Sequence, residues 1–163
     1  MPRDISTVRR LAEEGFNKHN LKFLDEIFSK DAISHDPSQP NLGRGPDGAR
    51  ESMQVYTTAF PDSKIVIERE IAEGDYVVQH LRASGTHSGP LANIPATGKK
   101  TNVTGVITSK LQDGEVVETW SLWDQLTLMQ QIGSSRCPRP RRSPNSSQRL
   151  ADFCVHERND ARR

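Results

Sequence analysis

The first 133 residues contain no cysteine, because both cysteines of the 163-residue chain, Cys137 and Cys154, lie near its C-terminus. Disulfide bonds therefore do not hold the body of the protein together, and we expect a reducing, cytoplasmic setting. No apolar run approaches the roughly 18 residues that cross a bilayer. Residues 1–11 are charged and lack the apolar centre of a signal peptide. We expect no membrane association.

Short motifs of metal and nucleotide sites are also missing from the sequence. There is no CxxC pair, no HExxH helix and no glycine-rich phosphate loop. No pair of residues has the spacing of metal ligands. The sequence thus predicts a protein that uses neither a metal ion nor a cofactor.

Positive charge is scarce in the body and concentrated at the C-terminus. Residues 134–163 contain eight Arg, no Lys and three acidic residues, a net charge of +5, whereas residues 1–133 carry −4. This arginine-, proline- and serine-rich extension has no apolar period and cannot bury enough surface to offset its loss of entropy on folding. We expect a disordered, dispensable extension. A nucleic-acid-binding arm is the less favoured alternative, because no aromatic residues alternate with the arginines.

Helical periodicity occurs in the first 60 residues. Apolar residues recur at helical spacing in residues 4–19, again in 21–28, and in 46–60, where Pro46 suits a first turn and Pro61 ends the pattern. Between them, residues 31–37 are short and extended, and residues 38–48 form a loop.

Strand periodicity begins at Lys64. Residues 64–71, 76–87, 99–111 and 115–124 read as four sequential strands, with turns at Gly74-Asp75 and Asp113-Gly114. Asp-Gly between two alternating runs is a strong hairpin signal, since type I′ turns need positive φ at both central residues. A short helix over 126–132 ends at Gly133. Helices followed by antiparallel strands predict an α+β fold, in which helices cover one face of a curved sheet and enclose a cavity.

Several blocks in order resemble the SnoaL-like polyketide cyclases, which share the cystatin-like α+β cone with nuclear transport factor and ketosteroid isomerase. The blocks are Ile33-Ser-His-Asp-Pro37, Ala59-Phe-Pro-Asp62, Glu73-Gly-Asp-Tyr-Val-Val78, Gly85-Thr-His-Ser-Gly89, Ile94-Pro-Ala-Thr-Gly98, Asp113-Gly-Glu-Val-Val-Glu-Thr-Trp120, Trp123-Asp124 and Leu128-Met-Gln-Gln-Ile-Gly133. The resemblance runs from roughly residue 5 to residue 133. We therefore expect residues 1–133 to form one SnoaL-like domain, with residues 134–163 outside it.

This resemblance implies an intramolecular aldol-type ring closure of a polyketide in secondary metabolism, without metal or cofactor. In relatives an aspartate at the position of Asp124 is the general acid/base. Relatives usually have a histidine or arginine where Lys110 stands. A homodimer or higher homo-oligomer is also implied, because members of the family often pair through the outer face of the sheet.

Asp124 is the candidate for proton transfer. The strand period puts Glu118, Trp120, Leu122 and Asp124 on one face, which suggests a cavity wall with Trp120 and Leu122 against the substrate. An apolar wall raises a carboxyl pKa toward neutrality, as acid/base catalysis requires. The alternative is that Asp124 only caps the helix that follows it.

Histidines supply the remaining candidates. His35 could hydrogen-bond a substrate carbonyl or orient Asp124, or be satisfied locally by the turn that follows. His87 is a candidate substrate contact in a loop of small residues, or a plain turn histidine. His80 shares a strand face with Arg82, and periodicity does not decide whether that face lines the cavity. Lys110 completes the predicted substrate contacts.

Two other functions remain open from the sequence. An isomerase or hydrolase could use the same fold with another acid/base arrangement, and a non-catalytic dimeric module could bind a small apolar ligand. The Asp124 carboxylate favours an enzyme. Predicted partners are thus a small-molecule polyketide and further copies of the chain, with no nucleic acid.

Overall fold

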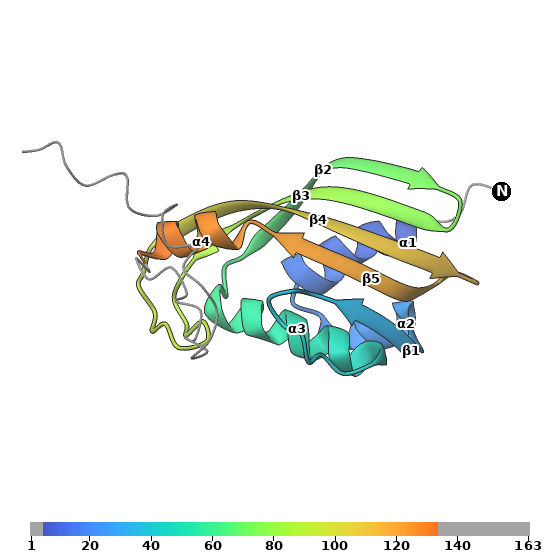
Figure 1. Cartoon of the computed structure of the whole chain (residues 1–163), viewed down its shortest axis with the longest axis horizontal. Helices are drawn as coiled ribbons and strands as arrows, with labels where there is room; N and C mark the ends of the chain where they lie inside the picture. Colours follow the sequence, from blue (N-terminus) through green and yellow to red (C-terminus); the bar gives the residue numbers. More distant parts are fainter. Residues whose placement is uncertain (1–4, 134–163) are drawn as a thin grey trace, which may run out of the picture.

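A computed structural model describes residues 5–133, so the predicted extension 134–163 lies outside the described residues. Helices come first and a sheet follows, with one strand between the helices (Figure 1). The elements are α1 (Ser6–Arg10), η1 (Leu11–Asn17), η2 (Leu21–Phe23), α2 (Leu24–Ile27), β1 (Phe28–His35), α3 (Gly45–Ala59), β2 (Lys64–Glu73), β3 (Tyr76–Thr86), β4 (Lys100–Gln112), β5 (Glu115–Trp123) and α4 (Gln125–Ile132).

The five strands form one sheet in the order β1-β5-β4-β3-β2. The four predicted strands are present, and each pairs antiparallel with its neighbour in the chain. β1 is the addition, since the segment predicted only as extended pairs in parallel with β5 and puts His35 opposite Trp120. Pairing of Phe28 with Val116 also explains why the predicted second helix stops at Ile27.

The predicted hairpin between β4 and β5 is confirmed. Asp113 and Gly114 both have positive φ, 52° and 87°, as a type I′ turn requires. The pairing of these strands shifts register between Lys110 and Leu111, so one residue of β5 is left over as a bulge near Val117. A bulge interrupts the alternation of faces along its strand.

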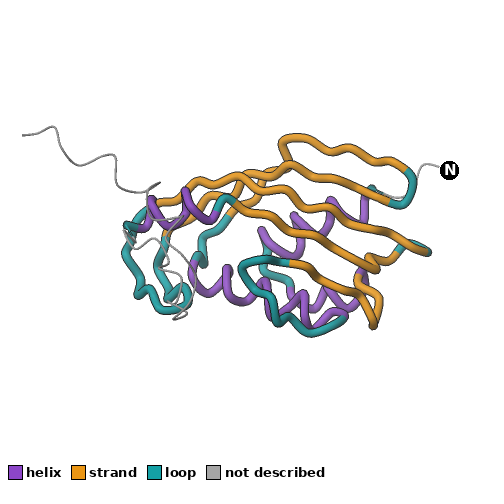
Figure 2. Tube along the Cα trace, in the orientation of Figure 1, coloured by secondary structure: helices purple, strands orange, loops and turns teal. Residues whose placement is uncertain are grey.

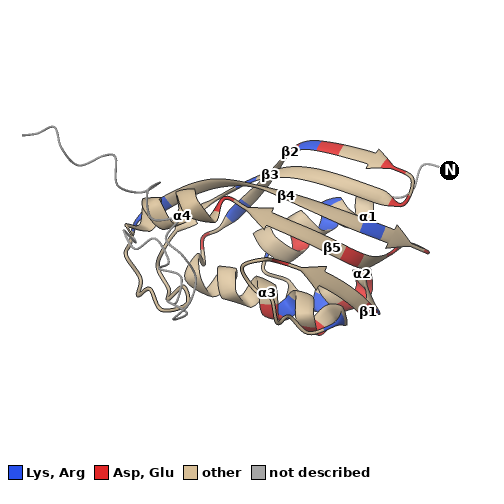
Figure 3. Cartoon of the chain, viewed as in Figure 1, with Lys and Arg blue, Asp and Glu red and all other residues tan. Residues whose placement is uncertain are grey.

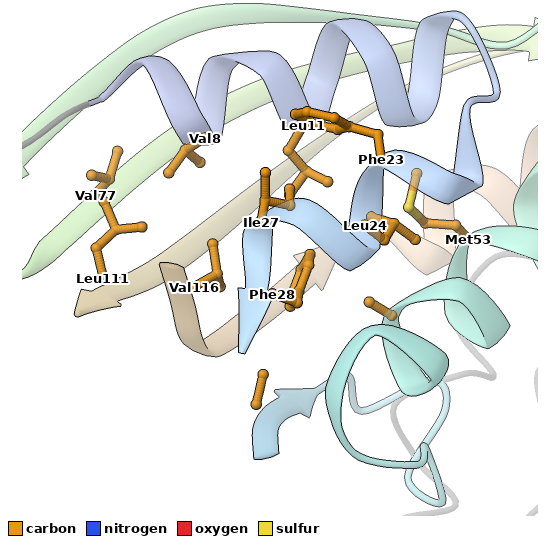
Figure 4. Close-up of a cluster of buried hydrophobic side chains, with 12 residues drawn as sticks. Val8, Leu11, Phe23, Leu24, Ile27, Phe28, Met53, Val77, Leu111 and Val116 are labelled. Atoms are coloured by element: carbon orange, nitrogen blue, oxygen red, sulfur yellow. The ribbon is translucent and has the colours of Figure 1, made fainter. Parts of the chain in front are cut away.

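Helices cover the concave face of the sheet and leave the other face open (Figures 1 and 2). The first predicted helix is observed as α1 continued by the π-helical η1, and the third as α3. The largest core cluster lies between these helices and one end of the sheet (Figure 4). Its fully buried members include Val8 on α1, Leu24 on α2 and Val116 on β5. The predicted α+β cone is confirmed.

α4 closes the other end of the sheet. The Gln131 side chain accepts from the backbone N–H of Asn102 at 2.8 Å and donates to its carbonyl at 3.0 Å, so it pairs with β4 like a short strand. Gly133 ends the helix in a left-handed conformation, as predicted. Among residues 5–133, no helix is long and apolar enough to cross a membrane.

Candidate active site

A cavity lies between the helices and the concave face of the sheet, at the end closed by α4. The empty space there, with open solvent at its mouth included, amounts to about 730 Å³. Its lining is mainly apolar and aromatic, with a few hydroxyls and two carboxylates. The lining residues are Phe16, Asp36, Ser52, Tyr56, Phe60, Ser63, Ile65, Ala83, Ser84, Gly85, Thr101, Val103, Ile107, Ser121, Trp123, Asp124, Gln125 and Leu128.

A second compartment of about 430 Å³ continues from the first toward β1. The two compartments share lining residues from both layers of the fold, namely Phe16, Asp36, Ser52, Ile107 and Ser121. The shared side chains include two serines and one aspartate, so polar groups lie where the two compartments meet. An elongated, mostly apolar molecule fits such a shape.

The face of β5 that borders the cavity carries Thr119, Ser121 and Trp123. Leu122 is 61% exposed on the opposite face of the sheet, and Trp120 shares that face. The prediction that Trp120 and Leu122 line the cavity is therefore wrong. The strand period correctly grouped Glu118, Trp120 and Leu122 but wrongly added Asp124, which lies beyond the end of β5. Periodicity also could not say which face points inward, because packing against the helices decides that.

Asp124 does border the cavity, because β5 ends at Trp123 and the chain turns at the next residue. Its carboxylate is the N-cap of α4, and Oδ1 accepts the backbone N–H of Thr127 at 2.9 Å. Hydrogen bonds from the side chain and the backbone of Thr127 lower the pKa of Asp124 below its ordinary 3.8. The prediction of a raised pKa is wrong, since the carboxylate lies at the exposed mouth rather than against an apolar wall. Asp124 therefore both borders the cavity and caps α4, so the two placements considered from the sequence are compatible.

Asp36 is a second carboxylate in this region, and the sequence did not single it out. It borders both compartments and is 8% exposed. Its Oδ1 accepts two hydrogen bonds from Ser38, one from the backbone N–H at 2.8 Å and one from the hydroxyl at 2.5 Å. Among the described residues, no hydrogen bond to Oδ2 is found. A buried carboxylate held by one oxygen is thus built into the cavity wall.

Hydrogen bonds continue from this carboxylate to the cavity mouth. The Ser38 hydroxyl lies 3.1 Å from the Tyr56 hydroxyl, and Gln125 Nε2 donates to the Tyr56 oxygen at 3.0 Å. Tyr56 and Gln125 both line the cavity, and Gln125 follows Asp124 in the chain. The chain of hydrogen bonds therefore joins the β1 loop, α3 and α4 at one rim.

His35 borders the second compartment, but its ring lies on the outer face of the sheet. The ring stacks on Trp120 with centroids 5.3 Å apart and planes 12° apart. Its Nε2 lies 2.8 Å from Oε1 of Glu118. The sequence suggested that His35 could orient Asp124, but the structure does not bring the two residues together. In its place the next residue, Asp36, turns toward the cavity.

His80 and Lys110 also face outward. Nδ1 of His80 lies 3.1 Å from Oε2 of Glu68, and Oε1 of the same carboxylate accepts from Arg82 at 2.5 Å. The hydrogen bond from Arg82 is the main cause that lowers the pKa of Glu68. Nζ of Lys110 lies 5.8 Å from the ring centroid of Tyr76. Neither predicted substrate contact borders the cavity, and both side chains lie on the outer face of the sheet.

His87 is fully buried, and its contacts are with other parts of the protein. Its Nδ1 lies 3.0 Å from Oγ1 of Thr97, and its carbonyl accepts the backbone N–H groups of Thr97 and Gly98. Its ring packs against Phe60 with centroids 5.3 Å apart. Burial lowers the pKa of His87, which keeps the ring neutral. His87 thus fastens the loop before β4 and lies outside the lining of both compartments.

Charge at the site is negative. The lining of the first compartment includes the carboxylates of Asp36 and Asp124 and no Lys, Arg or His. α4 and residues 52–59 of α3, which border the cavity, contain no charged residue (Figure 3). Over residues 5–133, no group of three potential metal ligands is assembled. The arrangement can remove a proton from a neutral apolar molecule, and it repels an anion.

The sequence profile of the SnoaL-like polyketide cyclases matches residues 6–132. The chain belongs to this family. Aklanonic acid methyl ester cyclase DnrD of Streptomyces peucetius is 27% identical to this chain over 138 residues, which cover 82% of this chain and 92% of DnrD. Asp124, at the cavity mouth, is the position at which the family resemblance puts the acid/base.

Solved structures agree with this SnoaL-like assignment. The structure assigned to the same family from Jannaschia sp. CCS1 superposes with a TM-score of 0.73 at 28% identity, covering 82% of this chain and 94% of that one. A protein of ketosteroid isomerase-like fold from Catenulispora acidiphila superposes with a TM-score of 0.68 at 14% identity, covering 79% and 93%. The latter shares the fold alone.

Proposed function

We propose that this SnoaL-like protein closes a ring in a polyketide by an intramolecular aldol reaction, with Asp124 as the proton-transfer group and without metal or cofactor. The observation that carries the proposal is an ionised carboxylate at the mouth of a largely apolar cavity. The hydrogen bonds from Thr127 keep Asp124 ionised at neutral pH, so the carboxylate is free to accept a proton, but they also make it a weaker base than an aspartate at its ordinary pKa. The support for the proposal is therefore the position of the carboxylate and not its pKa.

One carboxylate can carry out both proton transfers of the reaction. Asp124 takes the proton from a carbon next to a carbonyl group, and the resulting enolate carbon forms the new bond to a second carbonyl carbon. The oxygen of that carbonyl becomes an alkoxide and takes up a proton, which the protonated Asp124 returns. Addition leaves the molecular mass of the substrate unchanged. The apolar walls hold the two ends of the chain near one another, which lowers the entropic part of the barrier.

Charge in the cavity favours a substrate whose carboxyl group is masked. A free carboxylate would lie beside Asp36 and Asp124 with no cation in the lining of the first compartment. DnrD is named for an ester, aklanonic acid methyl ester. We therefore propose a neutral, ester-type polyketide as substrate.

A pair of matched probes tests this preference for a neutral ligand. Trp123 borders the cavity and Trp120 does not, so the Trp120→Phe protein reports binding through Trp123 alone. We expect methyl anthraquinone-2-carboxylate to quench Trp123 with at least a tenfold lower Kd at pH 7 than anthraquinone-2-carboxylate, about 1.4 kcal/mol. Asp36→Asn combined with Asp124→Asn is expected to narrow the difference. Equal affinities in the parent protein would contradict the prediction.

Product analysis in the native host tests the cyclase proposal itself. Deleting the gene is expected to replace the cyclised polyketide with an uncyclised compound of the same mass, separated by liquid chromatography and identified by mass spectrometry. Returning the gene is expected to restore the cyclised product. Unchanged product in the deletion strain would reject the proposal and leave the isomerase, hydrolase and ligand-binding alternatives.

The homodimer remains a prediction, and the open face of the sheet is the surface proposed for it. Leu122 is 61% exposed and pairs across the strands with Val106, and Val66 and Ile71 are 57% and 66% exposed. We expect light scattering to give twice the chain mass of 18.2 kDa. Leu122→Lys is expected to give a monomer that still binds the neutral ester probe. A monomeric parent protein would contradict this.

A further inference from the structure

We propose that Tyr56 is a further catalytic residue, whose hydroxyl donates a hydrogen bond to the carbonyl oxygen that becomes the alkoxide. Gln125, Ser38 and Asp36 act as positioning residues that hold this hydroxyl at the cavity rim. The inference rests on the proposed cyclase function and adds to it the group that stabilises the negative charge that develops on oxygen.

The direction of each hydrogen bond follows from the donors available. Ser38 has a single hydroxyl proton, and it goes to Asp36 Oδ1 at 2.5 Å, because a carboxylate can only accept. The 3.1 Å contact between the Ser38 and Tyr56 hydroxyls therefore uses the Tyr56 proton. Gln125 Nε2 donates to the Tyr56 oxygen at 3.0 Å. The order is Gln125 to Tyr56 to Ser38 to Asp36.

A chain of this kind strengthens the Tyr56 hydroxyl as a donor. Hydrogen bonds in a row polarise one another, and the effect is larger in surroundings of low dielectric. The N–H of Gln125 withdraws electron density from the Tyr56 oxygen, and the negative Asp36 at the far end aligns the row. Tyr56 therefore has a preset orientation that water in the cavity would not provide.

Asp36 and Ser38, at one end of this row of hydrogen bonds, are held in place by the protein itself. Asp36 is 8% exposed, receives two hydrogen bonds from Ser38 and accepts the backbone N–H of Gln39 through its carbonyl at 2.9 Å. The Gln39 side chain in turn donates to Ser52 on α3 at 3.2 Å. The loop after β1 is thus bonded to α3 at Ser52, one helical turn before Tyr56, as well as at Tyr56 itself.

During ring closure the Tyr56 proton shifts its acceptor without leaving its oxygen. In the empty site it is bonded to Ser38. As negative charge grows on the substrate oxygen, that oxygen becomes the stronger acceptor and takes the hydrogen bond. Ser38 stays bonded to Asp36, and Gln125 stays bonded to the Tyr56 oxygen. Asp124 still removes the carbon-bound proton and returns it to the alkoxide, so no further reactant is needed.

Two phenylalanine substitutions form the test, since the chain has two tyrosines and one lies on the outer sheet face. Tyr56→Phe and Tyr76→Phe each remove one hydroxyl. The substrate is the uncyclised compound isolated from the deletion host. For Tyr56→Phe we expect kcat to fall at least tenfold and KM to change less than threefold, because a bond formed in the transition state is lost. Tyr76→Phe is expected to match the parent protein within twofold.

Substitutions at Ser38 distinguish a positioning role in catalysis from a purely structural role. Ser38→Ala is expected to lower kcat about tenfold, and Ser38→Thr, which keeps the hydroxyl, to restore it within threefold of the parent protein. A fall in kcat for Tyr56→Phe no larger than for Tyr76→Phe would overturn the proposal, as would a change confined to KM. These outcomes leave the cyclase function intact. A deletion host that accumulates no uncyclised compound would overturn both proposals.

Discussion

Asp124→Asn is expected to lower the cyclisation rate by about 10²-fold or more with only a small decrease in the melting temperature, since the charge of the cap is lost and its hydrogen bond is kept. General acid/base groups contribute on the order of 10²–10⁴ in rate, and an amide cannot accept the carbon-bound proton. Asn is as good an N-cap as Asp, so the hydrogen bond from Thr127 to the cap is kept. The measurement is kcat on the isolated uncyclised compound, alongside thermal unfolding followed by circular dichroism.

Asp124→Ala is the matched comparison, because it removes the cap together with the carboxylate. We expect the same loss of rate as in Asp124→Asn, accompanied by a lower melting temperature. A normal rate for Asp124→Asn with a defect only in Asp124→Ala would show that the residue is a cap and nothing more. The two roles are thus separable by one pair of proteins.

The pH profile gives a further expectation for the same residue. Since the pKa of Asp124 is lowered from 3.8, its ionised form persists below that pH. The acid limb of the rate therefore lies below pH 3.8 in the parent protein. The stability that the ionised cap contributes is present above pH 3.8 and is lost as the pH falls through the lowered value. A limb near neutrality would mean that another group carries the proton.

Gly105→Ala is expected to disrupt the cavity from inside the sheet. Gly105 pairs with Trp123 across the strands, and the indole lies directly over it. A Cβ at this position would lie 2.6 Å from Cδ2 of the indole, so the ring must move. Overpacking of this kind costs typically about 1–3 kcal/mol. Because Trp123 borders the cavity, its displacement also changes the shape of the ligand site.

Two measurements check the Gly105 prediction. In the Trp120→Phe background, Gly105→Ala is expected to weaken binding of the neutral anthraquinone ester at least tenfold and to lower the free energy of unfolding by denaturant. Gly43→Ala is the control, since a Cβ there meets only ordinary contacts at 3.7 and 3.8 Å. If the two alanine proteins bind the ester equally well and have equal free energies of unfolding, the position of the Trp123 ring is not needed for ligand binding or stability.

Much of the backbone could be predicted from local patterns. The Asp113-Gly114 turn, the helix that begins at Asp124 and the left-handed Gly133 all depend on the backbone preferences of a few adjacent residues. β1 was identified only as an extended piece, because its parallel partner lies more than 80 residues further along the chain. Partners that distant leave no periodic signal in a single sequence.

Site residues were harder to predict than strands. His80, Trp120 and Leu122 were assigned to strands correctly, and His35 was assigned only to an extended piece. All four side chains face away from the cavity. Asp36 was passed over although it adjoins His35, since nothing in the local sequence says which of two neighbours turns inward. A polar residue directly after a short strand and before a proline was the available signal.

The sequence alone determined the class of fold, the hairpin and the place of Asp124 at the junction of a strand and a helix, since each depends on period, turn chemistry and capping. The tertiary structure decided which sheet face the helices cover, and with it which side chains meet the cavity. That choice depends on burial of apolar surface between distant elements. It also joined Gln125, Tyr56, Ser38 and Asp36 into one row of hydrogen bonds.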